Sequence, residues 1–222
     1  MSIRPSLLGL MLLGGCYTSF AQVDLRAGKG IDYKYEIKSV FNTDNIIYYG
    51  WDFSQSKLTD VDKFSDRKII VERHIPEWMI WLNGHFSAEF MQKKLKFTTV
   101  TANFQPVQDL SRKIDANSYV RVSNYEIKIE KLDSIVSTYI LPEKTGIGFI
   151  FIIESLNKPE RFVTGYATFF NIETRKLLWV TKIKEVPGSK YGFADYYRRG
   201  FIILWDVYYP NFYRKARRAY KN

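Results

Sequence analysis

The sequence has one cysteine and two histidines, and it contains no apolar run of membrane-spanning length. The lone cysteine excludes any disulfide within the chain, so stability has to come from a packed core. His74 and His85 are too far apart on one helix, at about 16 Å, to share a metal ion. His85 and Glu89 have a spacing that suits two metal ligands, but no third ligand accompanies them. We therefore expect neither a metal nor a cofactor.

Catalytic motifs are missing as well. The chain has no Gly-x-Ser-x-Gly elbow, no zinc-protease helix and no phosphate-binding glycine loop. Asp52 and Glu154 are acids near the ends of predicted strands. Glu154 follows a very apolar strand, where it could be desolvated or could pair with a lysine or arginine. A hydrolase with a site near Asp52, Glu154 and the loop 186–193 is therefore kept as the alternative to a non-enzymatic protein.

The N-terminus has the features of a secretory signal over residues 1–21. Arg4 gives the positive start, residues 7–13 form a short apolar run, and a small residue, Ala21, precedes the expected cut at Gln22. The signal predicts a periplasmic or secreted protein whose mature part, residues 22–222, is one domain. Cys16 resembles the lipid-bearing cysteine of bacterial lipoproteins, which would instead anchor the protein to the outer membrane.

Acidic residues are in deficit. The formal net charge is +10, and removing a signal that contributes only Arg4 leaves +9. Such a positive charge is typical of proteins whose partners are polyanions. For an exported chain, these are lipid headgroups or acidic glycans rather than nucleic acid in the cell. A further option is an envelope protein as partner.

The candidate binding residues lie near the C-terminus. The loop 186–193 is rich in glycine and carries polar and aromatic groups, as functional loops often do. Basic residues then outnumber acids up to the end of the chain, which indicates either a binding surface or a solvated helix end. The candidates are Lys190, Tyr191, Phe193, Arg198, Arg199, Arg214, Lys215, Arg217 and Arg218.

Periodicity predicts mixed secondary structure. Alternating residues favour strands at 31–41, 45–53, 97–101 and 119–129, whereas 57–66 is typical of a loop. Apolar spacing predicts helices from Pro76 to Lys94 and over 132–139, and Gly84 could divide the first of them. Residues 104–114 are ambiguous.

The C-terminal third has the clearest pattern. Residues 147–153, 162–170 and 177–183 predict an antiparallel three-strand meander, and the first strand is apolar on both faces. A largely buried helix is expected from about Asp195 until Pro210 ends or kinks it, with one face formed by Tyr197, Phe201, Leu204 and Tyr208. We expect an α/β (α+β) fold, a single layered domain with a mixed sheet and helices packed on it.

Several short motifs carry a resemblance. These are Gly146-Ile147-Gly148-Phe149, the residues 154–158 and 168–172, Leu178-Trp179 and Gly192-Phe193. They resemble uncharacterised secreted proteins of Bacteroides-like Gram-negative bacteria. Asn171 stands where that family tends to have Asp. The resemblance implies export and an α/β fold, similar by analogy to the N-terminal domain of TolB-type envelope proteins, and it implies no catalytic residues.

Overall fold

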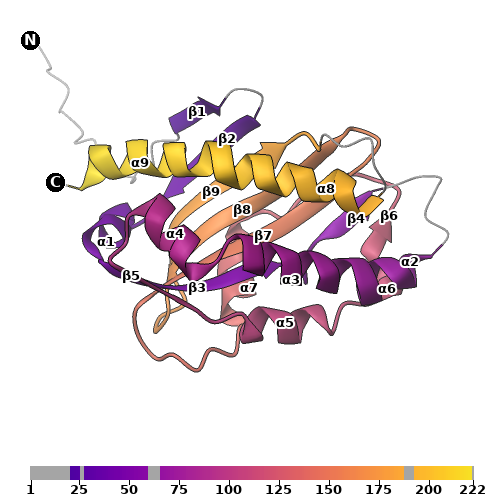
Figure 1. The fold of residues 1–222 in the computed structure, drawn as a ribbon, viewed down its shortest axis with the longest axis horizontal. Helices are drawn as coiled ribbons and strands as arrows, with labels where there is room; N and C mark the ends of the chain where they lie inside the picture. The colour runs from indigo at the N-terminus through magenta and orange to yellow at the C-terminus, as the bar shows by residue number, and fades with distance from the viewer. Residues whose placement is uncertain (1–20, 26–27, 60–65, 188–192, 222) are drawn as a thin grey trace, which may run out of the picture.

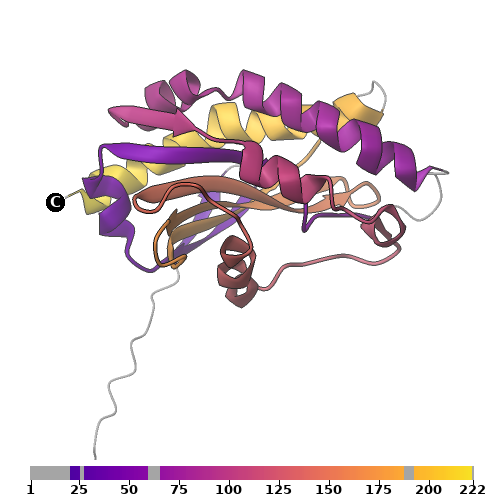
Figure 2. The ribbon, with the colours of Figure 1, turned by 90° about the horizontal axis from the view of Figure 1, so that it is seen from below.

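The computed structural model describes residues 21–25, 28–59, 66–187 and 193–221 of the chain. In this described part, strands and helices form one mixed sheet with helices on both of its faces, so the α/β class is confirmed (Figures 1 and 2). The strands are β1 (Ala21–Leu25), β2 (Gly28–Lys34), β3 (Asn45–Asp52), β4 (Lys57–Thr59), β5 (Thr99–Ala102), β6 (Val120–Arg121), β7 (Ile147–Asn157), β8 (Phe162–Asn171) and β9 (Leu177–Glu185).

The main order across the sheet is β1-β2-β9-β8-β7-β3-β5, and β4 pairs with both β6 and β7. β7, β8 and β9 pair antiparallel in sequence order. β3 lies parallel to both β5 and β7. All but the first residue of β7 are buried, which agrees with the apolar pattern on both of its faces.

The helical segments alternate with these strands. They are α1 (Ile37–Asn42), α2 (Arg67–Ile69), η1 (Ile70–His74), α3 (Ile75–His85), α4 (Ala88–Leu95), α5 (Gln105–Ser111), α6 (Ala116–Tyr119), η2 (Ile129–Lys131), α7 (Leu132–Ser137), α8 (Phe193–Ile202), η3 (Ile203–Tyr208) and α9 (Tyr209–Tyr220). We call α3, α4, α8, η3 and α9 the helical layer, because together they cover one face of the sheet (Figure 1). Figure 2 shows α7 on the opposite face.

Aromatic rings fill the space between the sheet and the helical layer. Trp51 stacks on Phe151 with centroids 4.5 Å apart, and Trp205 meets the same phenyl ring edge-on at 4.1 Å. Phe149 stacks on Phe169 at 4.3 Å. Such pairs add to the free energy gained by burying the rings, so a chain without disulfides is held by an aromatic core.

The C-terminal helix runs through Pro210 without ending. The π-helical turn η3 stands directly before it, and a wider turn accommodates a proline ring that would collide with the preceding turn of an α-helix. Of the expected buried face, Tyr197 and Phe201 are buried, and Trp205 and Tyr209 are buried beside them; the side chains of Leu204 and Tyr208 lie outside the described part. In an α-helix, residues four apart drift by roughly 40° per step. The π turn reduces this drift, so that Trp205 and Tyr209 continue the row begun by Tyr197 and Phe201.

Three sequence predictions in the first half of the chain need correction. Only the first part of 31–41 is a strand, because the chain turns into α1 at Ile37. The segment 57–66, expected as loop, begins with the short strand β4, and its residues 60–65 lie outside the described part. The strand expected at 97–101 lies instead at 99–102.

The predicted helix from Pro76 to Lys94 is two helices. The break falls at Phe86 and Ser87, where the Ser87 hydroxyl accepts a hydrogen bond from the Phe90 N–H and caps α4. Gly84 stays inside α3. Helical backbone also begins earlier than Pro76, at Arg67, where the Asp66 carboxylate caps α2.

The strand expected at 119–129 is wrong beyond Arg121. Ile127 donates its N–H to Glu154 Oε1 at 2.7 Å and accepts from the Tyr166 hydroxyl at 2.6 Å. Side chains of the sheet therefore satisfy this backbone in place of a neighbouring strand. Tyr119 and Ile127, which fitted the alternating pattern expected of a strand, are both buried. They anchor an irregular segment to the core instead.

Candidate functional site

The helix α9 is strongly amphipathic. Tyr209, Phe212 and Tyr213 are buried against the sheet. Phe212 and Tyr213 lie beside Trp179, with centroids 5.6 and 5.8 Å apart. The opposite side of α9 is exposed and basic, and the helix contains no aspartate or glutamate. The exposed basic residues are Arg214, Lys215, Arg218 and Lys221, the last directly after the helix.

The neighbouring helix α4 extends this surface. Its C-terminal end carries Lys93, and Lys96 follows at the cap; both are exposed. Arg217 of α9 joins the two helices, since its Nη1 donates to the carbonyl oxygens of Leu95 at 3.1 Å and Lys96 at 2.6 Å. The C-terminal end of α9 lies beside α4 and α1 (Figure 1).

We call Lys93, Lys96, Arg214, Lys215, Arg218 and Lys221 the basic face. Within the described residues, none of the six forms an ion pair with an acid. Arg214 hydrogen-bonds locally, to the Pro210 carbonyl oxygen and to Asn211. Lys94, by contrast, pairs with Asp206 at 3.0 Å and is excluded from the face. The positive charge of the six side chains is therefore available to an external anion.

A second group of side chains lies on α3, α4 and α8. The Arg198 guanidinium is centred 4.2 Å from the Trp81 ring. The His85 ring stacks on the same indole, with ring centroids 5.1 Å apart. Lys94 Nζ lies 5.1 Å from the Phe90 ring. Trp81 and Phe90 are both partly buried. Sequence reasoning missed Trp81, although its helical phase, off the row of Ile75, Met79 and Leu82, could have placed it outside the core.

The structure divides the nine candidate binding residues. Arg199, Arg214, Lys215 and Arg218 are exposed. Arg198 packs on Trp81, and Arg217 serves as a tie between helices rather than a free cation. Lys190 and Tyr191 lie outside the described residues, as does Cys16. Phe193 begins α8, but its side chain is not described.

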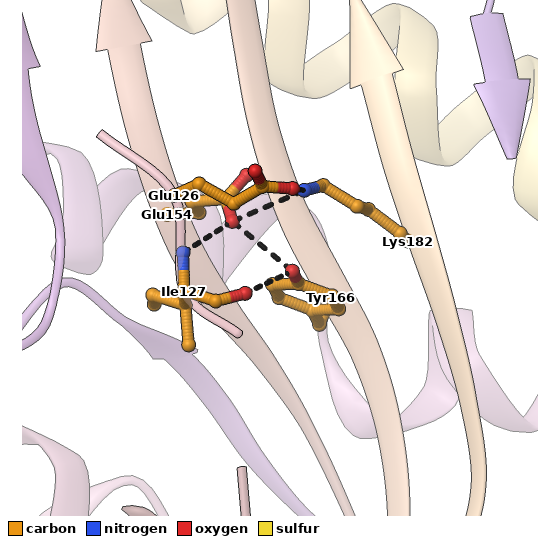
Figure 3. Close-up of polar contacts among 5 residues, drawn as sticks. All are labelled: Glu126, Ile127, Glu154, Tyr166 and Lys182. Atoms are coloured by element: carbon orange, nitrogen blue, oxygen red, sulfur yellow. Dashed lines mark hydrogen bonds and ion pairs between the residues drawn. The ribbon is translucent and has the colours of Figure 1, made fainter. Parts of the chain in front are cut away.

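Glu154, one of the two acids singled out, is the centre of a buried polar cluster (Figure 3). Its Oε1 accepts the Ile127 N–H and lies 3.0 Å from the Tyr166 hydroxyl and 3.3 Å from Lys182 Nζ. Lys182 also pairs with Glu126 at 2.6 Å, and this bond lowers the pKa of Glu126. The cluster thus ties the irregular segment at 126–127 to β7, β8 and β9.

Asp52, the other acid, is buried at the end of β3. Its Oδ1 accepts the Ser54 N–H at 2.7 Å, and its Oδ2 accepts the Tyr139 hydroxyl at 2.6 Å. Burial raises the pKa of Asp52 and outweighs these hydrogen bonds, which lower it. Asp52 and Glu154 thus have separate partners, and neither lines the nearby pocket of about 480 Å³ formed by residues between Gln55 and Thr138.

A larger pocket of about 530 Å³ lies between α3 and α5. Val71, Met79 and Ile80 form part of its lining, and charged residues such as Glu72 and Arg112 contribute too. Glu72 pairs with Lys68 and Arg112 with Asp109, so the charges here are balanced. No sequence motif had pointed to this pocket.

Among the described residues, no three or more His, Cys, Asp or Glu side chains gather in a way that could hold a metal ion. His85 lies 3.9 Å from Asp206, on η3. His74 lies 3.6 Å from Glu77. In the same part of the chain, no helix combines the length and hydrophobicity needed to cross a bilayer.

Comparisons with known proteins add little. No family model matches the sequence, and no curated protein matches it either. Among solved structures, the chain is similar to the PelC dodecamer from Paraburkholderia phytofirmans, with 6% identity and a TM-score of 0.25. That match covers 79% of this chain and 95% of the other. Such a low TM-score carries no argument about fold or function.

Proposed function

We propose that this protein is an exported, non-enzymatic binding module of the cell envelope that docks on an anionic surface through the basic face. The observation that carries the proposal is the gathering of six cations on and next to two adjacent helices, none of which forms an ion pair within the described residues, in a chain of net charge +10. Charges of one sign on one face attract polyanions at long range. The sheet and its C-terminal meander β7–β8–β9 form the rigid scaffold behind that face.

The buried acids favour binding over hydrolysis. A general acid or base has to reach the proton that it transfers. Asp52 and Glu154 are both almost wholly buried, and their carboxylate oxygens accept internal hydrogen bonds. Their environment therefore supports a role in holding the segment around Ile127 and Tyr139 on the sheet.

The test compares two doubly neutralised variants of equal net charge. Lys215→Gln with Arg218→Gln removes two cations from the basic face. Lys128→Gln with Lys131→Gln removes two exposed cations near α7, on the opposite side of the sheet. Binding is measured on immobilised heparin and on vesicles containing phosphatidylglycerol, over a series of salt concentrations.

We expect the first variant to bind at least one of these anionic surfaces roughly 30-fold more weakly, since each cation near an anionic surface contributes about 1 kcal/mol. The second variant is expected to bind like the unchanged protein, and all binding is expected to weaken with salt. If both variants lose the same affinity, the net charge of the protein governs binding and the basic face has no special role. Absence of binding to both surfaces at low salt would overturn the proposed function.

A further inference from the structure

We infer that the anionic surface is a phospholipid bilayer, and that Ile80 and Trp81 of α3 enter its headgroup region beside the basic face. This inference rests on the proposed function and names its partner. The observations that carry it are an exposed apolar residue, the single partly exposed tryptophan, and their position in the same helical layer as the cations.

Ile80 is 70% exposed. Its neighbours on α3 that point to the core, Ile75, Met79 and Leu82, are buried, so Ile80 points away from the sheet. Gly84, one turn later, is also exposed, and a Cβ added there would meet nothing within 4 Å. Ile80 and Gly84 therefore form a short uncharged stretch on α3, between exposed Glu77 and exposed His85 and beside the pocket that Ile80 lines with α5.

Trp81 differs from the other four tryptophans. Trp51, Trp78, Trp179 and Trp205 are at most 2% exposed, whereas Trp81 is only partly buried and packs beneath the Arg198 guanidinium. Tryptophan and arginine side by side suit a membrane interface, because the indole ring prefers the headgroup level and the guanidinium binds phosphate.

The cations and the apolar residues share one layer. α3 and α4 are consecutive helices, and α4 lies beside α9, to which Arg217 ties it. Figure 1 shows these helices side by side on the same face of the sheet. A bilayer with acidic lipids offers both phosphate for the basic face and an apolar interior for Ile80, whereas a soluble polyanion offers only the first.

Isolated exposed apolar residues are common on protein surfaces. Val122, directly after β6, and Ile140, after α7, are 76% and 84% exposed, and neither belongs to the helical layer. Ile80 is distinguished by its combination with Trp81 and with the charge complementarity between the basic face and acidic lipids. Ile140 provides a matched control for that reason.

The experiment uses the intrinsic fluorescence of the purified protein. Vesicles contain phosphatidylglycerol whose acyl chains are brominated, so that a tryptophan at the membrane is quenched; vesicles of phosphatidylcholine alone serve as the neutral control. We expect quenching with the acidic vesicles only, and we expect Trp81→Phe to abolish it, because the remaining tryptophans are buried in the core.

Affinity gives the second measurement. Ile80→Ser is expected to weaken binding to acidic vesicles roughly tenfold and to leave binding to heparin unchanged, whereas Ile140→Ser is expected to change neither. Both residues are exposed, so neither substitution disturbs the core. Vesicle binding without quenching, or equal effects of Ile80→Ser and Ile140→Ser, would overturn the entry of Ile80 and Trp81 into the bilayer while the proposed function stands. If the unchanged protein binds neither heparin nor acidic vesicles, the proposed function itself is overturned.

Discussion

The Tyr139 hydroxyl donates a 2.6 Å hydrogen bond to Oδ2 of Asp52, across 87 positions of sequence. Asp52 is completely buried, and within the described residues no lysine, arginine or histidine forms an ion pair with it. The pair joins the end of β3 to the segment after α7. Because burial raises the pKa of Asp52, the pair also makes the stability of the fold depend on pH.

Asp52→Asn is expected to change that pH dependence. The folded protein keeps the Asp52 proton at pH values above the ordinary pKa of 3.8, where the unfolded chain has lost it. Between the ordinary and the raised pKa, stability contributed by Asp52 therefore falls as pH rises. Asparagine keeps both hydrogen bonds by accepting from Ser54 and donating to Tyr139.

Urea unfolding of both proteins from pH 4 to pH 8 measures this effect. We expect the unchanged protein to lose stability relative to Asp52→Asn as pH rises. A difference that stays constant over this range, or that grows in the other direction, would contradict the raised pKa.

Lys182→Met is expected to destabilise the fold by about 3–5 kcal/mol. The substitution removes the cation 3.3 Å from Glu154, which is 2% exposed, and removing one partner of a buried ion pair is costly. Glu126→Gln removes the exposed partner of the same lysine, so its cost is expected to be about 0–1 kcal/mol. Chemical denaturation measures both; equal costs would show that burial of Glu154 does not govern the cluster.

Gly50 and Gly84 are expected to respond oppositely to alanine. Gly50 has φ of +85°, and a Cβ there would lie 2.6 Å from Asn83 Oδ1. Gly50→Ala should therefore destabilise the protein by at least about 1 kcal/mol. Gly84 is helical with open space around it, so Gly84→Ala should stabilise by about 0.5–1 kcal/mol. Thermal unfolding distinguishes the two, and a loss of stability on Gly84→Ala would contradict the open surface of α3.

Arg217 and Arg218 are adjacent arginines for which we expect different roles. Arg217→Ala removes two hydrogen bonds to carbonyl oxygens at the end of α4 and is expected to cost about 1–3 kcal/mol of stability. Arg218→Ala should leave stability within about 0.5 kcal/mol and weaken binding to acidic vesicles. Unfolding and vesicle sedimentation are measured on both variants. If Arg217→Ala and Arg218→Ala lose stability and vesicle binding to the same extent, the two arginines do not have different roles.

Local sequence patterns predicted the continuous elements well. The strands at 45–53 and 147–153 and the helix at 132–139 are present, because the strands are nearly continuous buried runs and the helix buries Leu132, Ile135 and Val136 at helical spacing. The strand prediction for 119–129 failed because the partners of Ile127 are Glu154 and Tyr166, which are distant in sequence. No local pattern can reveal which side chains will satisfy a backbone so far away.

The candidate site was predicted in part, for a similar reason. Basic residues clustered at the C-terminus were evident from composition, and four of them are exposed on the helical layer. Arg217 could not be separated from Arg218 by sequence, since its role depends on the carbonyl oxygens of Leu95 and Lys96. Lys93 and Lys96 join the face only because α4 ends beside α9.

The row of buried aromatics on the C-terminal helix also has a consequence for the order of folding. Trp205, Tyr209, Phe212 and Tyr213 follow the strands of the described sheet in sequence, and they pack against β7 and β9 and cover part of their apolar side. Until these residues have been synthesised, only α3 and α4 of the helical layer can cover the aromatic face of the sheet. We therefore expect the helical layer to be completed only after α8, η3 and α9 have been synthesised, and a chain that lacks α9 to expose an aggregation-prone apolar surface.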